Sequence, residues 1–332
     1  MAAITDAMVI RRRMARPRSV RGRAASAVAV VLVGGALLAS CGAGSSKKAA
    51  PPTTTTRETT TTFAETTASS GAPAEPAAST KRYSHIVWVW MENHTYNQVI
   101  GNPSAPYETS LAHQYGTATH YASVGSPSLP NYIGATSGGT QGIADDADPT
   151  VHVLTVDNLF RQVRAVGGTA RSFEESMPNN CVLGGVGTYA VKHNPAAYYT
   201  GADDRSACKT DDVPFSGTLP SGTLPTFSFV TPNLCDDTHD CPVAAGDTWL
   251  KSFLPPLLHG ADYQGGSTAI FVVWDEYTTM PNVVISPTTP AGTVTAQPFD
   301  HYSLLRTTEE MLGLPLLGRA ASATSMRAAF HL

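Results

Sequence analysis

The chain lacks several features that would have assigned it to other protein classes. No pair of its five cysteines has the Cys-x2-Cys spacing, which argues against a four-cysteine zinc site. The apolar run from Ala25 to Leu38 is too short and too rich in small residues for a membrane span. Positive charge is also scarce after residue 80. The chain has 22 basic and 26 acidic residues, of which 10 basic and 4 acidic ones precede Lys81. Residues 81–332 therefore hold 12 basic and 22 acidic residues, a formal net charge of −10. We therefore expect no nucleic-acid partner.

The N-terminal segment has the features of an export signal. Seven arginines lie between positions 11 and 23, the apolar run follows, and Leu38-Ala39-Ser40-Cys41 resembles a bacterial lipobox. We expect residues 1–40 to be removed, with Met1 or Met14 as the start, and Cys41 to be lipidated. An ordinary signal peptide with an incidental cysteine is the alternative. The mature protein is then a lipoprotein on the outer face of the cell membrane, or is secreted.

Two further regions follow from composition. Residues 41–80 are rich in Thr, Ser, Ala and Pro and have few large apolar side chains. Such a segment cannot bury enough surface to offset its ordering entropy, so we expect a disordered tether. Residues 81–332 have a size typical of one α/β enzyme domain. We expect this domain to be monomeric.

Four cysteines remain after Cys41, an even number that suggests two disulfides in an exported chain. Three pairings are open. The one that closes the shortest loops joins Cys181 to Cys208 and Cys235 to Cys241.

Short apolar runs alternate with helical patterns along the domain. The runs end in polar residues and cover 85–90, 169–173, 227–230 and 269–274. Near-continuous apolar runs are typical of strands buried on both faces. Asp157 is a predicted cap for a helix that Gly167-Gly168 ends, and a second helix is predicted over 303–312. The pattern predicts an α/β fold with a doubly wound, mostly parallel sheet flanked by helices, whose ligands bind beyond the carboxyl ends of the strands.

Two of the predicted strands run directly into pairs of polar residues. Glu92-Asn93 follows the first strand and Asp275-Glu276 the last. Oxygen ligands of these kinds suit a divalent cation, and two adjacent carboxylates repel each other unless a cation lies between them. The alternatives are a helix N-cap for the first pair and a solvated turn for the second.

Ser128 is the candidate nucleophile. Pro130 suits the first turn of a helix, which places Ser128 at a helix N-terminus, where free amides and the helix dipole favour an anion. A plain serine cap is the alternative interpretation.

Basic side chains that could contact phosphate occur in two polar stretches. Lys192 and His193 lie in one, and His239 lies in the Asp-x-His-Asp element of the other; loop residues without a catalytic role are the alternative. His301 could reach the site or cap the last helix. Glu174-Glu175 would support the site or face solvent. The acidic stretch 145–148 lacks the spacing of a calcium loop, so solvation is favoured there.

Taken together, these motifs resemble the bacterial acid phosphatase/phospholipase C phosphoesterase family, closest to the secreted acid phosphatases that act on phosphoinositides. The resemblance rests on the joint order of six stretches: MENHTYNQVIGN, SPSLPNYIGATSG, YAVKHNP, TPNLCDDTHDC, FVVWDE and DHYSLLRTTEEMLGLP. It covers residues 82–318 and implies the fold of the alkaline phosphatase superfamily.

By position, the resemblance implies roles for particular side chains. It implies a metal-binding Glu-Asn pair at Glu92 and Asn93, an Asp-Glu pair at Asp275 and Glu276, and the nucleophile at Ser128. It also implies phosphate-contacting histidines at His193 and His239. The pattern departs from close relatives at Ser126, where they often have histidine.

The sequence therefore predicts a metal-dependent phosphoesterase that acts through a phosphoserine. One divalent cation of unknown identity would bind at Glu92, Asn93, Asp275, Glu276 and the Ser128 hydroxyl. Asn93, Lys192, His193 and His239 would contact the phosphoryl oxygens of a phosphorylated small molecule or phospholipid. A phospholipase C that cleaves diesters is the nearest alternative. A non-catalytic surface lipoprotein that binds metal or phosphate is the alternative from another class.

Overall fold

The structure, a computed structural model, describes residues 83–332. The expected signal segment, the lipidation site at Cys41 and the tether lie outside the described residues, so those expectations stay predictions. Within the part of the chain that is described, no helix is both long and apolar enough to cross a bilayer.

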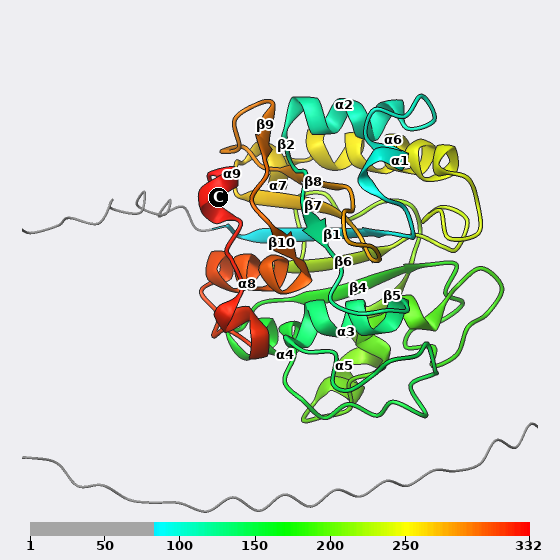
Figure 1. The fold of residues 1–332 in the computed structure, drawn as a ribbon. Coiled ribbons are helices and arrows are strands. Elements are labelled where there is room, and N and C mark those ends of the chain that lie inside the picture. Colours follow the sequence, from blue (N-terminus) through cyan, green and yellow to red (C-terminus); the bar gives the residue numbers. More distant parts are fainter. Residues whose placement is uncertain (1–82) are drawn as a thin grey trace, which may run out of the picture. The chain divides into compact units, whose positions relative to one another are not determined.

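An eight-stranded sheet forms the centre of the described domain (Figure 1). The strands lie in the order β5-β4-β6-β1-β7-β8-β2-β9, and within this sheet only β8 runs antiparallel to its neighbours. The strands are β1 (His85–Met91), β2 (Gly116–Ala118), β4 (Ala170–Glu175), β5 (Asp212–Phe215), β6 (Phe227–Thr231), β7 (Thr268–Trp274), β8 (Asn282–Ile285) and β9 (Thr293–Thr295). A small second sheet pairs β3 (Tyr121–Ala122) with β10 (Phe299–Asp300). The predicted mostly parallel sheet is confirmed.

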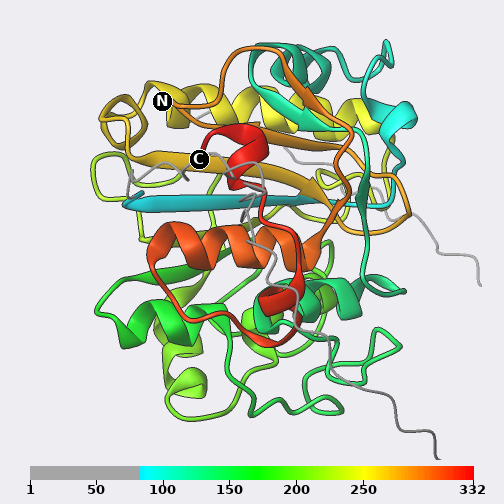
Figure 2. The same ribbon diagram turned by 60° about the vertical axis from the view of Figure 1, so that its left-hand side comes forward.

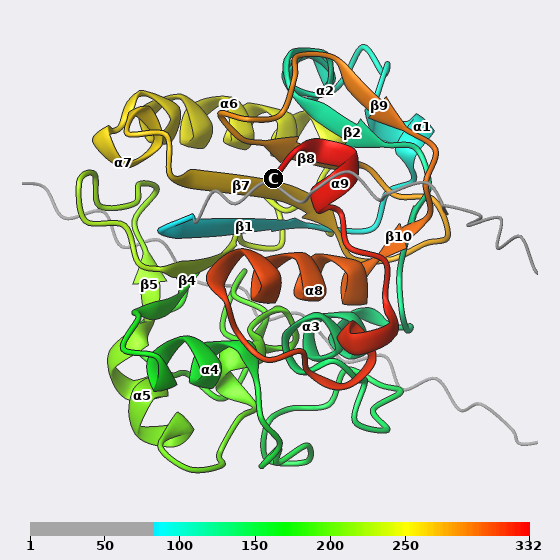
Figure 3. The same ribbon diagram turned by 90° about the vertical axis from the view of Figure 1, so that its left-hand side faces the viewer.

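Helices cover both faces of this sheet (Figures 2 and 3). One layer holds α2 (Pro106–Gln114), α6 (Val243–His259) and α7 (Ala261–Gln264). The other holds α3 (Ser128–Ser137), α4 (Leu159–Ala165), α5 (Asp204–Asp211) and α8 (His301–Leu312). The short helices are α1 (Tyr96–Val99), α9 (Arg327–Phe330) and three 3₁₀ turns, Val191–His193, Pro195–Ala197 and Gly318–Ser322. The doubly wound arrangement is therefore also confirmed.

The central strands explain why the sheet is buried on both faces. Six of the seven residues of β1 and all seven of β7 are buried. Trp88 and Trp90 of β1 pack against Phe227 and Phe229 of β6, with ring centroids 4.9 to 6.1 Å apart. Aromatic and β-branched side chains on both faces of each strand leave no polar face for water, so helices must cover both sides.

Two predicted helix starts need correction. Asn158, and not Asp157, caps α4, because its side chain accepts a hydrogen bond from the Arg161 amide at 2.9 Å. Helix α8 begins two residues earlier than predicted, at His301, because the Asp300 side chain caps it. It ends at Gly313 in the left-handed region (φ 71°), a conformation that glycine adopts without steric cost.

Both disulfides are present, with the pairing that closes the shortest loops. Cys181–Cys208 ties the segment after β4 to α5. Cys235–Cys241 closes a seven-residue loop after β6, which carries the Asp-x-His-Asp element. The second bond therefore fixes the ends of a loop at the carboxyl edge of the sheet.

Candidate active site

The two predicted acidic pairs lie side by side. Strands β1 and β7 are parallel neighbours in register, with Met91 opposite Trp274, so Glu92 and Asp275 leave the same edge together. Both are completely buried. Glu92 and Asn93 do not begin a helix, because α1 begins only at Tyr96 and Thr95 is its N-cap. The helix-cap alternative for Glu92-Asn93 is therefore excluded.

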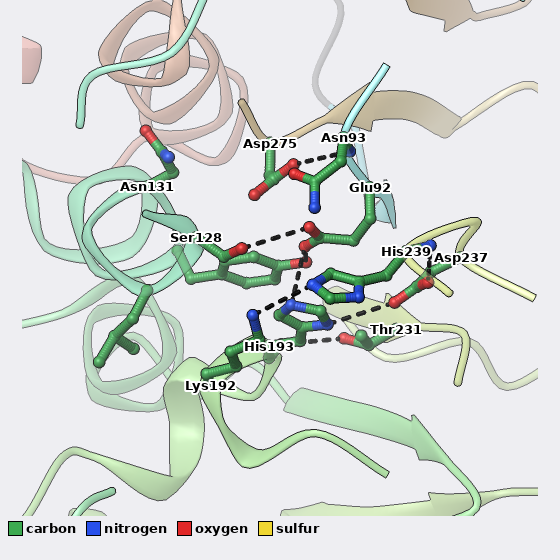
Figure 4. A network of polar contacts seen from close by, with 12 residues as sticks. Glu92, Asn93, Ser128, Asn131, Lys192, His193, Thr231, Asp237, His239 and Asp275 are labelled. Carbon is green, nitrogen blue, oxygen red and sulfur yellow. Dashed lines mark hydrogen bonds and ion pairs between the residues drawn. The ribbon is translucent and has the colours of Figure 1, made fainter. Parts of the chain in front are cut away.

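Asn93 lies between these carboxylates (Figure 4). Its backbone is in the left-handed region (φ 59°), which turns the chain at the end of β1. Its backbone amide donates to Asp275 Oδ1 at 3.2 Å. With its side-chain nitrogen toward the acids, Asn93 also donates to Glu92 Oε2 at 3.3 Å and to Asp275 Oδ1 at 3.2 Å. With the amide turned over, its oxygen is a ligand for a cation.

Ser128 joins the cluster from the opposite side. It is the first residue of α3 and is 2% exposed, and its hydroxyl donates to Glu92 Oε2 at 3.3 Å. Asn131 secures the loop before it: Oδ1 accepts from the amides of Val124 and Gly125, and Nδ2 donates to the carbonyls of Gly125 and Pro127. The asparagine of the Ser-x-Pro-Asn stretch therefore orders the turn that presents the serine.

Tyr132, one turn along α3, supports Glu92. Its hydroxyl donates a hydrogen bond to Glu92 Oε1, and its ring lies parallel to the His193 ring at a centroid distance of 5.2 Å. Both side chains are buried. Tyr132 therefore restricts the orientation of Glu92 and of His193 together.

His193 lies between two carboxylates. Its Nε2 is 3.2 Å from Glu92 Oε1, and its Nδ1 is 3.2 Å from Asp237 Oδ2. Asp237 Oδ1 accepts from the backbone amide of His239 at 2.7 Å. One fully buried aspartate therefore contacts one histidine and orders the loop that carries the other.

A second cluster is partly exposed. Lys192 Nζ lies 3.0 Å from Asp146 Oδ2 and 3.2 Å from His239 Nε2, and His239 Nδ1 lies 2.7 Å from Asp240 Oδ1. Glu276 belongs to this side: the pKa of its carboxyl is raised by burial and then by Asp146. In the described residues its side chain makes no hydrogen bond to the Glu92 cluster.

Burial dominates the electrostatics of the site. It raises the pKa of Glu92 well above the ordinary range, with Asp275 and Asp237 adding repulsion, and it raises the pKa of Asp275 to about 7 and of Asp237 to about 8. Burial lowers the pKa of His193 well below its usual value, and Lys192 adds to the effect. Without a cation this cluster favours protonated acids and neutral histidine.

The donor set fits a metal ion. Asp275 Oδ2 is buried and has no hydrogen-bond partner within the described part of the chain, and Asp237 Oδ2 has only the contact with the His193 ring. Glu92, His193 and His239 each offer a ligand atom within 4.8 Å of the others. Buried carboxylate oxygens without donors, beside an amide oxygen and imidazoles, are suitable ligands for a divalent cation. Glu92 belongs to this histidine group as well as to the predicted acidic set.

His301 lies behind the site and not in it. It is fully buried; its Nε2 is 2.8 Å from the Asp275 carbonyl oxygen and its Nδ1 is 3.1 Å from the Tyr121 hydroxyl. It holds the backbone of Asp275, while Asp300 caps the helix.

Glu174 is buried with Ser172 and Thr231, whereas Glu175 is partly exposed and accepts from the Asn233 amide.

Four residues of the site were not assigned by sequence reasoning: Asn131, Tyr132, Asp146 and Asp237. The signal for Asp237 was its place in the same Asp-x-His-Asp element as His239. Asn131 and Tyr132 stand directly after Pro130 in the nucleophile stretch. The expected solvation of the 145–148 loop is wrong for Asp146, which pairs with Lys192.

Comparison with known proteins agrees with this geometry. The phosphoesterase family matches residues 102–280. A phosphatidylinositol-3-phosphatase of Mycobacterium tuberculosis is 30% identical over 253 residues, which cover 74% of this chain and 83% of that protein. A phosphate-repressible acid phosphatase of Penicillium chrysogenum is 30% identical over 275 residues. That match covers 76% of this chain and 65% of the fungal protein, so the chain spans just under two thirds of its length.

The fold has a solved counterpart. A protein of the alkaline phosphatase superfamily from Vibrio parahaemolyticus superposes with a TM-score of 0.51 over 75% of this chain and 72% of that one, at 13% identity. The family match over more than half of the chain, with 30% identity to a phosphatase across three quarters of it, leads to one conclusion. The chain belongs to the phosphoesterase family, has the fold of the alkaline phosphatase superfamily, and is an enzyme that hydrolyses phosphoric esters.

Proposed function

We propose that the protein is a metal-dependent acid phosphatase that hydrolyses phosphomonoesters through a phosphoserine at Ser128. The observation that carries the proposal is the Ser128 hydroxyl, 3.3 Å from Glu92 Oε2 at a helix N-terminus and beside buried acids. A binding protein would need carboxylates or cations but no buried serine at their centre. A serine in this position has an acceptor for its proton and can attack phosphorus.

A divalent cation would be held by Glu92, Asn93 and Asp275, with Glu276 and the Ser128 oxygen as further proposed ligands. Bound there, it would supply positive charge that stabilises the serine alkoxide and the developing charge on phosphorus. The buried acids with raised pKa values and the unpartnered Asp275 Oδ2 support this assignment.

The chain's own groups account for the remaining steps. As Ser128 Oγ attacks phosphorus in line, it passes its proton to Glu92 Oε2, the bond from phosphorus to the leaving alkoxide breaks, and the phosphoryl group passes to the serine. Lys192, Asn93 and the two histidines, His193 and His239, contact the phosphoryl oxygens. The leaving alkoxide takes up a proton from the partly exposed His239 or from water. Water then hydrolyses the phosphoserine, so two in-line displacements retain configuration at phosphorus.

The test of this proposal is Ser128→Ala. We expect turnover of p-nitrophenyl phosphate to fall by about 10³-fold or more, since covalent catalysis is lost. Wild-type enzyme quenched in acid during turnover should carry labelled phosphate on Ser128, found by peptide mass analysis. Near-wild-type turnover in the variant, or label on another residue, would exclude this nucleophile.

The substrate proposal is a phosphomonoester, with phosphoinositides as candidates. The two relatives described above are named phosphatases, and one name specifies phosphatidylinositol 3-phosphate; this favours a monoester over the diester of a phospholipase C. Phosphate release from phosphatidylinositol 3-phosphate should exceed headgroup release from phosphatidylcholine. The reverse ranking would favour phospholipase C activity.

We also propose export and lipid anchoring at Cys41. The two disulfides fit an oxidising compartment. Cells fed a labelled fatty acid should label the protein, and Cys41→Ala should abolish the label. Retention of label in that variant would contradict the anchor.

A further inference from the structure

Asp146 makes two hydrogen bonds to residues outside its own loop. Oδ1 accepts a hydrogen bond from the Leu129 amide at 3.0 Å, and Oδ2 accepts one from Lys192 Nζ at 3.0 Å. The Asp146 side chain is 28% exposed and that of Lys192 is 21%. One carboxylate therefore joins helix α3 to the turn that carries Lys192 and His193.

The first contact lies next to the proposed nucleophile. Leu129 directly follows Ser128, and Pro130 has no amide hydrogen, so Asp146 takes one of the few free donors at this helix N-terminus. A carboxylate is favoured there by the helix dipole. It fixes the first turn of α3, and therefore the backbone of Ser128, relative to the Asp146 loop.

The second contact continues to His239. Lysine can only donate, so His239 Nε2 accepts in the 3.2 Å contact with Lys192 Nζ. The Asp240 carboxylate can only accept, so His239 Nδ1 donates to Asp240 Oδ1, 2.7 Å away. Together these two partners define one ring tautomer. A continuous chain of contacts therefore runs from the residue beside the nucleophile to a proposed phosphate ligand.

We propose that Asp146 is a positioning residue that couples Ser128 to Lys192, so that the nucleophile and the phosphate-binding cation keep a fixed separation. Asp146 does not touch the substrate. The proposal rests on the proposed function for the roles of Ser128 and Lys192. An isolated ion pair on a surface would contribute little. The hydrogen bond from the Leu129 amide to Asp146 Oδ1 is what links the Asp146–Lys192 pair to the reacting serine.

The experiment is a double-mutant cycle on the full, metal-loaded enzyme. The variants are Asp146→Ala, Lys192→Met and the double variant, assayed for kcat, KM and inhibition by inorganic phosphate. We expect each single variant to raise KM and the phosphate inhibition constant about tenfold, and the double variant to be no worse than Lys192→Met alone. Additive losses would show that Asp146 does not act through Lys192 and would overturn the proposal.

Two further variants separate positioning from folding. Asp146→Asn keeps an acceptor for the Leu129 amide but loses the charge that holds Lys192, so we expect KM to rise with an unchanged melting temperature. Asp148→Ala is the control, since Asp148 is exposed on the same loop and its carbonyl, not its carboxylate, accepts the bonds from Val151 and His152. Wild-type kinetics in Asp146→Asn, or equal damage in Asp148→Ala, would contradict the proposal. Activity retained by Ser128→Ala would instead reject the nucleophile and leave the cycle interpretable.

Discussion

The site has two halves that differ in origin and exposure. The carboxylate half, Glu92, Asn93 and Asp275, comes from the ends of two adjacent strands, and its two acids are completely buried. The cationic half, Lys192 and His239, comes from loops, with side chains 21% and 26% exposed. Buried strand ends hold atoms at fixed separations, as an ion requires. Partly exposed loop residues remain open to an arriving substrate.

The same difference sets the size of the energies involved. In the carboxylate half, burial removes the water that would solvate the acids, so their charges depend on fixed partners. In the cationic half, solvent screens the pairs and weakens each contact. Substitutions in the carboxylate half should therefore have the larger effects. They should change metal content and kcat/KM, whereas substitutions in the cationic half should change KM.

The largest expected effect comes from Glu92→Gln. It removes a buried charge that contacts Ser128, Tyr132 and His193, so we expect kcat/KM to fall by about 10³-fold, together with loss of bound metal. Elemental analysis of the purified variant and steady-state kinetics measure the two effects. Wild-type metal content with wild-type activity would show that this half does not hold the ion.

Tyr132→Phe should have an intermediate effect on the same half. It deletes the hydroxyl that donates to Glu92 but keeps the ring that packs on His193. We expect metal affinity to fall about 10- to 100-fold, since the partners of metal ligands contribute that much. Titration of the metal-free enzyme with Zn²⁺ or Mn²⁺, followed by activity, measures it. An unchanged midpoint would mean that Tyr132 serves packing alone.

The cationic half should respond differently to Lys192→Met. Because Lys192 is partly exposed and is a proposed contact of the phosphoryl oxygens and not of the metal, we expect KM to rise about tenfold while metal content stays unchanged. The wild-type KM should also rise with salt, and the variant should lose most of that dependence. A loss of metal in this variant would erase the distinction between the halves.

The smallest expected effect on catalysis lies outside both halves, at Glu108, where a substitution should change stability instead. The Glu108 side chain is 1% exposed and lies outside the Glu92 cluster. Its Oε1 accepts a hydrogen bond from the Trp274 indole, and burial raises the pKa of its carboxyl to about 8. The folded state therefore binds a proton that the unfolded state releases above pH ~4.5, so stability falls as pH rises from about 4.5 to 8.

Glu108→Gln keeps an acceptor for the indole and removes this titration. We expect wild type and variant to have similar unfolding free energies near pH 4.5, and the variant to be more stable by on the order of 3 kcal/mol above pH 8. Urea unfolding of both proteins across this range measures the difference. Parallel pH profiles would place the pH dependence in other buried acids.

The strand bodies and their acidic ends could be predicted because each depends on local pattern. Apolar runs such as Ala269–Trp274 specify buried strands, and the carboxyl ends of neighbouring parallel strands meet at one edge. Glu276 shows the limit of this reasoning. Strand β7 ends at Trp274, so strand alternation does not place the side chain of Glu276; Asp275 is completely buried beside Glu92, whereas Glu276 is partly exposed. Asn93 faces the cluster because its left-handed backbone turns the chain.

The loop contacts could not be predicted in the same way. Asp146 and Lys192 are 46 residues apart, and no periodicity links the loop of one to the turn of the other. Asp237 belonged to a motif, yet its contact with His193 depends on how the disulfide-closed loop folds over the sheet. Motif membership indicated that such residues matter, and only the three-dimensional structure assigned their partners.

The place of β1 at the centre of the sheet has a consequence for biosynthesis. Ile86 pairs with Phe227 and His85 with Thr268, so the first strand of the domain waits for partners 141 and 183 residues later in the chain. Until they are synthesised, a strand with two tryptophans remains without its neighbours and is prone to aggregate. We expect refolding from urea to be slow and its yield to fall as protein concentration rises.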